Sequence, residues 1–310
     1  MHIYRWDLDK TYLDTDFGSL RGLVRAATEK ASQKRAVPGA PSLLRGLSAD
    51  EAARIFILSG SPTQMRDVLE EKLRIDGVRF ESLILKDNLG NLRRGRFRAI
   101  RGQFGYKLPA LLASRREVDV GFRETLFGDD AEVDALIYSV YGDACSGRLS
   151  AAQVSRILEA AGAYPDRIEI AMEAMAGLEV GDAVVEDIFI HLEQGSPPRR
   201  FAALGPRVVP VFSWWQAALV LHERGRLDSG ALRAVMDEVA EAEGLAPWGL
   251  AGLAQDLVRR GHATAAMLDG LDGEVATLSR QALSRLPAPA PVPASEDVAD
   301  YVGLLNRWEK

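Results

Sequence analysis

Asp7-Leu8-Asp9-Lys10-Thr11 follows directly on the apolar and aromatic run Ile3-Tyr4-Arg5-Trp6. The run predicts a short buried strand, and the pentapeptide places two carboxylates and a hydroxyl at the end of that strand. In an open α/β sheet, ligands bind in the crevice beyond the carboxyl ends of the strands. We therefore expect Asp7 and Asp9 to face such a crevice. Asp and Thr are also common turn residues, so the pentapeptide alone fits an ordinary turn equally well.

Strands and helices alternate over the first two hundred residues. Apolar patterns predict strands at residues 54–58, 80–85, 123–127 and 184–192, with helices at 18–35, 42–47, 63–73, 108–115, 147–162 and 166–177, and one more ending at Tyr141. This alternation predicts parallel βαβ units. We expect an α/β fold with an open, Rossmann-like parallel sheet in which the strand at residues 3–6 lies between those at 54–58 and 123–127.

The pattern becomes helical after Pro206. The apolar stretch at residues 208–221, with Trp214 and Trp215, predicts a buried helix; a membrane-dipping segment is the alternative, because the stretch is too short to span a bilayer. Further helices are expected at residues 229–243, 247–260 and 264–286, the first of them capped by Ser229. A Pro/Ala linker at 287–293 leads to a closing helix capped by Ser295. The sequence thus divides into a sheet domain at residues 1–200 and an all-helical region at 206–310 packed on it.

Composition limits the class of function. The chain of 310 residues has a formal net charge of -6, which argues against general nucleic-acid binding. Its single cysteine, Cys145, excludes an intramolecular disulfide and favours a reducing, cytoplasmic location. A cleavable leader is not expected, because its removal would take Asp7 with it. The four histidines are scattered without metal-ligand spacing.

Polar groups in four segments could converge at one sheet edge. They are Asp7, Asp9 and Thr11, then Ser59, then Lys107 at an expected helix start, then Asp129, Asp130 and Asp134. Phosphoryl transfer through an aspartyl-phosphate needs a carboxylate nucleophile, a second acid for the proton, Mg²⁺ held by oxygen ligands, and a hydroxyl and a lysine for the phosphoryl oxygens. Taken singly, Ser59 fits a helix N-cap and Lys107 a solvated surface lysine.

The order and spacing of these segments resemble the haloacid dehalogenase-like superfamily. Its four motifs match residues 7–11, Ser59, Lys107, and Gly128-Asp129 followed by Asp134. A narrower resemblance, covering about residues 1–192, is to the catalytic domain of the actin-patch-associated phosphatidate phosphatase family and its bacterial relatives. It is carried by Ser59-Gly60-Ser61-Pro62 and by residues 83–87, 107–108 and 127–138. Lys10 departs from that family, which often has an acid there; its side chain is expected to point away from the metal.

The resemblance implies a role for each matched residue. Asp7 would be the nucleophile and a Mg²⁺ ligand, and Asp9 the general acid/base that also offers its backbone carbonyl to the metal. Ser59 and Lys107 would hold phosphoryl oxygens, while Thr11 supports the loop and, with Gly60, lies beside the substrate. Asp129 would bind Mg²⁺, and Asp130 and Asp134 would position either the metal or Lys107. The implied activity is that of a metal-binding hydrolase, a phosphatase acting on a phosphorylated small molecule or a lipid phosphate such as phosphatidate.

A basic run between residues 93 and 101 has no place in these motifs. Arg93, Arg94 and Arg96 stand there without an acidic neighbour and next to aromatic residues. They predict a cationic rim that binds an anionic substrate or touches a membrane peripherally. A solvated loop is the plain alternative, and nucleic-acid binding is a third that the acidic whole disfavours.

Two further interpretations of the whole chain remain. One is a catalytically silent lipid- or protein-binding module on the same fold, which is disfavoured because Asp7, Asp9, Ser59, Lys107 and Asp129 are all present. The other is a dehalogenase, which is disfavoured because such relatives generally lack the second acid, here Asp9.

Overall fold

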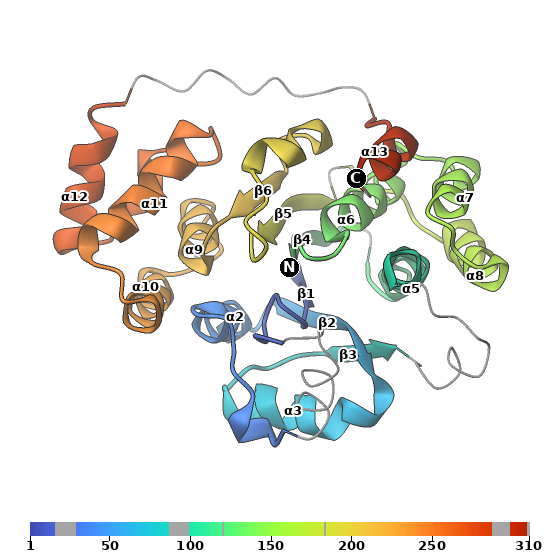
Figure 1. Ribbon diagram of the computed structural model, residues 1–310, viewed down its shortest axis with the longest axis horizontal. Helices are drawn as coiled ribbons and strands as arrows, with labels where there is room; N and C mark the ends of the chain where they lie inside the picture. Colours follow the sequence, from blue (N-terminus) through green and yellow to red (C-terminus); the bar gives the residue numbers. More distant parts are fainter. Residues whose placement is uncertain (16–28, 87–98, 120, 183, 287–297, 309–310) are drawn as a thin grey trace.

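A parallel sheet forms the middle of the molecule in the computed structural model (Figure 1). The structure describes residues 1–310 except 16–28, 87–98, 120, 183, 287–297 and 309–310. Within the described residues the sheet has six strands in the order β3-β2-β1-β4-β5-β6. The strands are β1 (His2–Asp7), β2 (Ala53–Pro62), β3 (Ser82–Lys86), β4 (Arg123–Asp129), β5 (Val185–His191) and β6 (Val208–Val211). The expected α/β fold with an open, Rossmann-like parallel sheet is therefore present.

Strand β1 lies at the centre, as its sequence predicts. It pairs in parallel with β2 on one side and with β4 on the other, and every residue of β1 is buried. Successive side chains of a strand point to opposite faces of the sheet. Tyr4 and Trp6 join the hydrophobic cluster on one face, whereas Arg5 and Asp7 contact side chains of helix α5 on the other. The alternation in residues 3–7 thus sends the charged side chains of β1 to one face.

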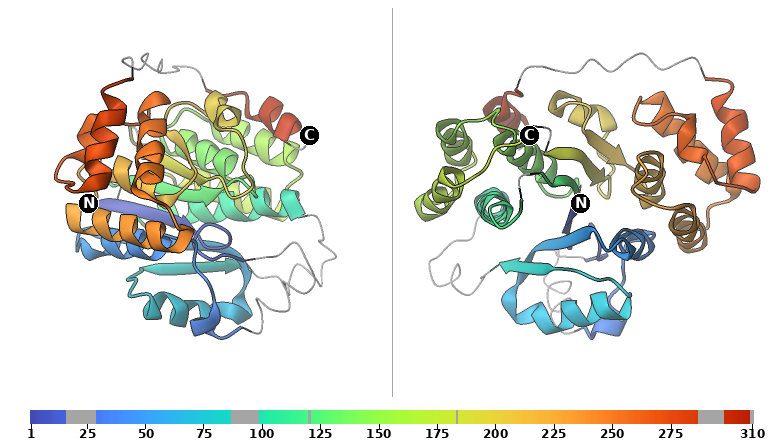
Figure 2. Two further views of the ribbon diagram at one scale, coloured as in Figure 1. Left: turned by 60° about the vertical axis from the view of Figure 1, so that its left-hand side comes forward. Right: turned by 180° about the vertical axis from the view of Figure 1, so that it is seen from behind.

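Helices cover both faces of the sheet (Figures 1 and 2). One face carries α2 (Ala40–Ala49), α3 (Arg66–Ile75), α9 (Trp214–Glu223), α10 (Ser229–Glu243), α11 (Pro247–Arg259) and α12 (Glu274–Leu283). The other face carries α5 (Ala99–Arg115), α6 (Asp134–Cys145), α7 (Ala151–Ala160), α8 (Pro165–Ala176) and α13 (Tyr301–Trp308). Short 3-10 helices occur at Ala31–Gln33, Thr63–Met65, Pro198–Leu204 and Ala265–Leu268. Each face buries its own large hydrophobic cluster.

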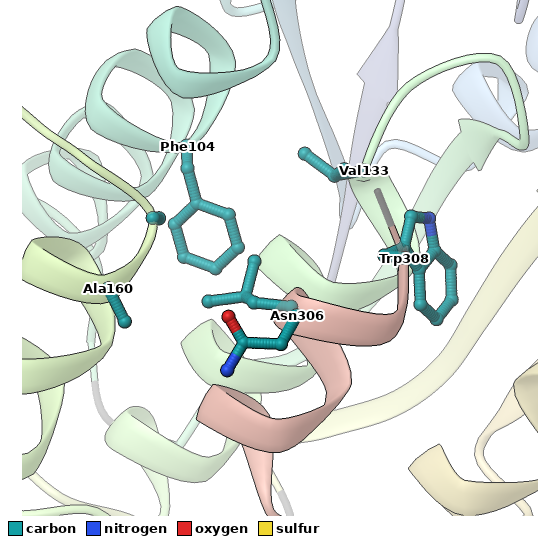
Figure 3. A pocket seen from close by; sticks show the side chains of 7 residues that line it. Phe104, Val133, Ala160, Asn306 and Trp308 are labelled. Carbon is teal, nitrogen blue, oxygen red and sulfur yellow. The ribbon is translucent and has the colours of Figure 1, made fainter. Parts of the chain in front are cut away.

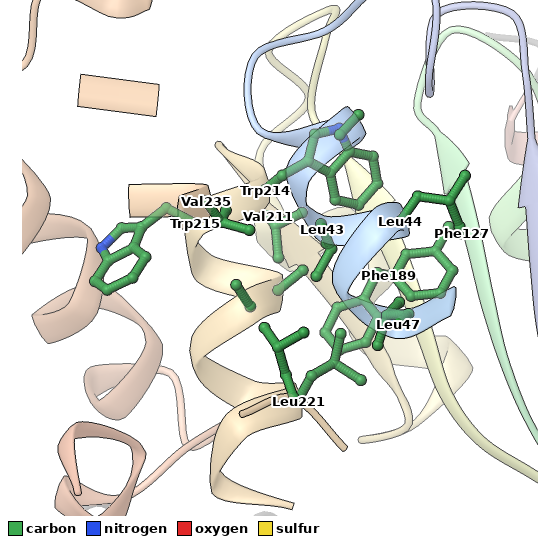
Figure 4. Packing of buried hydrophobic residues seen from close by; sticks show 14 of the residues in the cluster. Leu43, Leu44, Leu47, Phe127, Phe189, Val211, Trp214, Trp215, Leu221 and Val235 are labelled. Atoms are coloured by element: carbon green, nitrogen blue, oxygen red, sulfur yellow. The ribbon is translucent and has the colours of Figure 1, made fainter. Parts of the chain in front are cut away.

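The C-terminal helices share a core with the first half of the chain. Trp214 of α9 lies 5.9 Å from the ring of Phe127 of β4, and α2 packs its leucines into the same cluster (Figure 4). Gly39 precedes α2 with φ +83°, and a Cβ there would come within 2.6 Å of Val239 of α10. Only glycine fits this close approach, which brings α10 against the start of α2.

Strand β6 corrects the prediction that residues after Pro206 are all helical. Residues 208–211 form the edge strand beside β5, and the helix of the apolar stretch begins only at Trp214. An apolar run of this length cannot be divided into strand and helix by periodicity alone. Pro210 is tolerated because β6 lies at the edge, where one side of the strand needs no ladder partner.

Several other element boundaries differ from the sequence prediction. Lys107 lies in the middle of α5, which begins eight residues earlier, and not at a helix start. The N-cap of α10 is Asp228, not Ser229. The stretch 264–286 is interrupted, because Gly270 and Gly273 separate a 3-10 helix from α12. Most of the helix expected at 18–35, the linker at 287–293 and Ser295 lie outside the described residues.

The last helix, α13, packs on the face opposite to that of α12. The Tyr301 hydroxyl donates a hydrogen bond of 2.6 Å to Asp143 Oδ2 of α6. Leu305, Asn306 and Trp308 close a cavity of about 30 Å³ against α5 and α7 (Figure 3). That volume has room for about one or two water molecules.

In the part of the chain that the structure describes, no helix is both long enough and apolar enough to cross a membrane.

Candidate active site

The site lies where the strand order reverses. From β1 the chain proceeds outward through β2 to β3, and then returns to the other side of β1 for β4, β5 and β6. The carboxyl ends of β1 and β4 flank the crevice at this switch point, which is where ligands bind in open α/β sheets. Asp7 is the last residue of β1 and Asp129 the last of β4. The sheet therefore brings together two carboxylates that are 122 positions apart in the sequence.

A third carboxylate completes a buried cluster. Asp7, Asp129 and Asp134 each place a carboxylate oxygen within 4.8 Å of the others, and their side chains are at most 1% exposed. Asp134 is the first residue of α6, and its side chain lies over Gly128. A Cβ at position 128 would meet Asp134 Oδ2 at 2.5 Å. The glycine before Asp129 is thus what lets Asp134 approach the end of β4.

Lys107 is the cation of this cluster. Its Nζ lies 2.7 Å from Asp7 Oδ1, 2.6 Å from Asp134 Oδ1 and 2.8 Å from Glu132 Oε2. The lysine is fully buried, and burial disfavours its charged form. The carboxylates of Asp134, Asp7 and Glu132 outweigh burial and hold the pKa of Lys107 well above its ordinary value. Lys107 therefore carries its positive charge throughout the physiological range.

Negative charge is in excess around Lys107. Burial raises the pKa of Asp7 well above its ordinary value; Lys107 works against this, while Asp134, Glu132 and Asp129 add to it. Burial likewise raises the pKa of Asp129, and raises that of Asp134 to about 6. Asp7 Oδ2 and Asp134 Oδ2 accept no hydrogen bond from any described residue. Buried carboxylate oxygens without a donor are costly, and either a proton or a bound cation would remove that cost.

The donor set fits a divalent metal ion. Asp7, Asp129 and Asp134 offer only carboxylate oxygens, which suit Mg²⁺, and the two oxygens without donors belong to this set. A bound cation would reverse the rise in the pKa values of these aspartates, because it favours their charged forms. Asp7 could then be the anionic nucleophile that the sequence predicts.

Asp9 occupies a different environment from Asp7. Its Oδ2 accepts hydrogen bonds from Ser59 Oγ at 2.8 Å and from Ser61 Oγ at 2.9 Å. Burial raises the pKa of Asp9, and the two hydroxyls partly oppose the rise. Lys10, with φ +62°, makes the tight turn after Asp9 and pairs with Glu193 at 4.0 Å rather than with the aspartate cluster. The two acids of the motif thus differ in partners: Asp7 contacts a cation, and Asp9 contacts hydroxyls.

Thr11 links the turn after β1 to the end of β4, the neighbouring strand in the sheet. Its Oγ1 donates a hydrogen bond of 3.1 Å to Asp129 Oδ2, while Asp129 Oδ1 accepts from the backbone N–H groups of Ala131 and Glu132. Trp214 Nε1 donates to the backbone oxygen of Thr11 at 3.1 Å. Helix α9, far along the chain, therefore helps to position the turn that contains Asp9 and Thr11.

Asp130 does not join the cluster. Its two carboxylate oxygens accept hydrogen bonds from the backbone N–H groups of Gln194 and Ser196, at 2.7 and 2.9 Å. Both of its oxygens thus hold the loop after β5, and Asp130 is not part of the cluster of three aspartates, so this geometry gives no support to the prediction that Asp130 positions the metal or Lys107. Asp134 contacts Lys107 and lies in the cluster, and its role toward a metal stays a prediction. Arg93, Arg94 and Arg96 lie outside the described residues.

Three contacts at the site were not predicted from the sequence. Ser61 donates to Asp9; Glu132 accepts from Lys107; and Gln103 Nε2 donates to Glu132 Oε1 at 2.6 Å. Gly60 lies next to Gln103, whose Nε2 would be 3.2 Å from a Cβ at that position. A signal existed for Ser61, because alternate residues of a strand share a face and Ser59 was already a candidate. Gln103 precedes Lys107 by one helical turn, a spacing that likewise places the two on one face of α5.

Comparisons of this chain with protein-family models, with curated proteins and with solved structures find no match. The site thus combines a carboxylate beside a cation (Asp7 with Lys107), a second carboxylate that accepts from two hydroxyls (Asp9), and a group of carboxylate oxygens suited to a hard metal ion.

Proposed function

We propose that this chain is a Mg²⁺-dependent phosphomonoester hydrolase that acts through an aspartyl-phosphate on Asp7. The observation that carries the proposal is the unequal environment of two acids on one short turn. Asp7 lies 2.7 Å from Lys107 within the carboxylate cluster, whereas Asp9 contacts Ser59 and Ser61. Pairs of titratable groups with different surroundings are suited to divide nucleophilic and proton-transfer work.

In the first half-reaction Asp7 is the nucleophile and Asp9 is the general acid. An Asp7 carboxylate oxygen attacks phosphorus, forming the O–P bond of an aspartyl-phosphate while the bond from phosphorus to the leaving oxygen breaks. The protonated Asp9 carboxyl gives its proton to that oxygen, so the alcohol leaves neutral. Ser59 and Lys107 would hold phosphoryl oxygens as charge spreads over them.

The second half-reaction returns the enzyme to its starting state. The Asp9 carboxylate takes a proton from a water molecule, whose oxygen attacks phosphorus and releases inorganic phosphate from Asp7. Asp9 is then protonated again and Asp7 is a carboxylate. Asp7, Asp129 and Asp134 would hold Mg²⁺, with the Asp9 backbone carbonyl as a further candidate ligand. When bound, the ion offsets the repulsion between these carboxylates and an anionic phosphoryl group.

A lipid phosphate such as phosphatidate is the finer proposal for the substrate. Its support is the resemblance of residues 83–87 and 127–138 to the phosphatidate phosphatase family, together with the basic run that contains Arg93, Arg94 and Arg96. Peripheral membrane contact through that run would follow from attraction to anionic lipid.

The test of the proposed function is hydrolysis of p-nitrophenyl phosphate by the purified chain. We expect turnover with Mg²⁺, loss of turnover in excess chelator and recovery when Mg²⁺ is restored. Calcium should restore little, because its looser coordination misplaces the nucleophile. Phosphatidate in vesicles, run in parallel, decides whether the lipid proposal stands. Binding of phosphatidate vesicles without release of phosphate from either substrate would instead support the silent module, and turnover in chelator would exclude the metal-dependent mechanism.

A further inference from the structure

Lys86 lies at the edge of the candidate site. It is the last residue of β3, and the strand pairing places it beside Pro62, directly after the segment that contains Ser59 and Ser61. Its Nζ lies 5.7 Å from the centroid of the Tyr106 ring. A Cβ at Gly102 would come within 3.3 Å of that Nζ, so the glycine leaves the room that the ammonium occupies against α5.

Helix α5 contacts both Lys86 and the aspartate cluster around Lys107. Residues one turn apart share a helix face, so Gly102 and Tyr106 form one row and Gln103 and Lys107 form the adjacent row. The first row contacts Lys86, and the second contacts Glu132 and the aspartate cluster. The Tyr106 hydroxyl also donates to the backbone oxygen of Ser59 at 3.0 Å. Gln103 and Lys107 of α5 therefore lie between the Lys86 ammonium and the aspartate cluster, where the phosphoryl group of the proposed substrate would bind.

The Lys86 ammonium has no carboxylate partner among the described residues. Lys72 and Lys107, two other buried lysines, each pair with carboxylates within 2.8 Å. Lys86 is half-buried, and burial lowers its pKa; Glu132 opposes that shift, whereas Arg167 of α8 and Lys107 add to it. A half-buried cation without a counter-ion is costly, and an anionic ligand would remove that cost.

We infer that Lys86 binds a second anionic group of the substrate, so that the preferred substrates are phosphomonoesters that carry another phosphate or a carboxylate. This inference rests on the proposed function, since it takes the Asp7 cluster as the place where the phosphoryl group reacts. Lys86 contacts the part of the substrate that does not react, and it therefore determines specificity. Such a contact stabilises the bound substrate and the transition state alike, so its loss should appear in KM rather than in kcat.

The experiment compares alkanediol bisphosphates with the matching monophosphates, with spacers of increasing length. Wild-type protein should hydrolyse the bisphosphate with higher kcat/KM at one spacer length. The Lys86→Gln variant should lose about ten- to a hundred-fold in kcat/KM on that bisphosphate, through KM, as expected for one charge-assisted hydrogen bond. On the monophosphate it should equal the wild type. Lys86→Arg should recover most of the preference, and Lys30→Gln, which removes an exposed lysine, should change neither substrate.

Several outcomes overturn the inference. Equal loss on both substrates would mean that Lys86 holds the reacting phosphoryl group or the fold, and no preference in the wild type would remove the second-anion site. Both leave the phosphatase in place, because the monophosphate is still turned over. If neither substrate is hydrolysed, the proposed function fails, and calorimetry with propane-1,3-diyl bisphosphonate decides separately. Weaker binding by Lys86→Gln than by wild type would support the anion site, and equal binding would refute it.

Discussion

Two buried ionic clusters lie on the same face of the sheet, and they are built from the same elements. Strand β1 supplies Arg5 to one and Asp7 to the other, and helix α5 supplies Arg115 and Lys107. Strand β4 completes them with Glu124 and Asp129. The two clusters are therefore built on the same strands and helix and are both buried, and they differ in how charge and hydrogen bonds are balanced.

The first cluster is fully paired. Glu124 accepts hydrogen bonds from Arg5, from Arg115 and from the Tyr141 hydroxyl, and Ser114 accepts a further one from Arg5. Burial alone would raise the pKa of Glu124, but Arg5 and then Arg115 hold it below its ordinary value. A buried ionic group whose oxygens are all satisfied stabilises one packing arrangement.

The second cluster is left incomplete by the protein. The carboxylates of Asp7, Asp134 and Glu132 pair with the ammonium of Lys107, and Asp129 lies beside them. Asp7 Oδ2 and Asp134 Oδ2 lack donors among the described residues. The pKa values of the three aspartates are raised rather than lowered. Strongly perturbed carboxylates at a switch point are typical of candidate functional sites. We therefore interpret the first cluster as structural, and the proposed function assigns the chemistry to the second.

Asp7→Asn should give the largest effect on activity. The amide keeps the shape of the side chain but removes the attacking charge and a metal ligand, so turnover of p-nitrophenyl phosphate should fall at least about a thousand-fold. Because the cluster carries excess negative charge, the thermal midpoint in chelator should not fall. Circular dichroism and a stopped assay measure both. Near-wild-type turnover would exclude the aspartyl-phosphate mechanism.

Glu124→Gln should give the reverse result. It leaves two arginines without their buried anion, and breaking such a pair by removing one partner costs about 3–5 kcal/mol of unfolding free energy. Urea unfolding measures this loss. Turnover per folded molecule should stay at the wild-type level, since Glu124 contacts none of the candidate site residues among its described partners. A variant that stays stable but loses activity would erase the distinction between the two clusters.

The fold could be predicted further than the site. Strand–helix alternation and the buried run at residues 3–6 were enough to place β1 between β2 and β4. Which of the neighbouring acids faces the cluster was beyond sequence, because Asp130 and Asp134 differ only through the turn at Gly128 and the loop held by Asp130. Contacts between distant segments, such as that of Trp214 with Thr11, leave no local pattern. The proposed chemistry remains a prediction in every respect.

Ser61→Ala tests Asp9, whose carboxylate has hydrogen-bond donors and yet lies in the candidate site. Ser61 and Ser59 both donate to Asp9, so the variant keeps one donor and should reduce turnover roughly ten-fold, about the value of one hydrogen bond to a charged group. Ser155→Ala on the exposed face of α7 is the control and should have no effect. Unchanged turnover in Ser61→Ala would make Ser59 the sufficient partner of Asp9.

Asp187→Asn in β5 tests whether a buried carboxylate oxygen without a hydrogen-bond donor is by itself evidence of a functional site. Asp187 is buried and its Oδ1 has no donor among the described residues, as in the second cluster. It differs in charge balance, because Arg224 pairs with its other oxygen. Burial raises the pKa of Asp187 to about 6, against the opposing effect of Arg224. We expect a stability effect alone, and a small one.

Proton binding at Asp187 determines how the free energy of unfolding changes with pH. Between the ordinary pKa of an aspartate, near 4, and the raised value near 6, the folded chain binds more protons at Asp187 than the unfolded chain does. Lowering the pH from 7 to 5 should therefore stabilise wild type relative to Asp187→Asn by about 1 kcal/mol. Paired urea titrations at the two pH values isolate this difference, because the other carboxylates titrate in both proteins. Asp187→Asn should hydrolyse p-nitrophenyl phosphate as wild type does. If it lost activity instead, a missing donor alone would mark function, and charge imbalance would no longer be the property that distinguishes the cluster around Lys107.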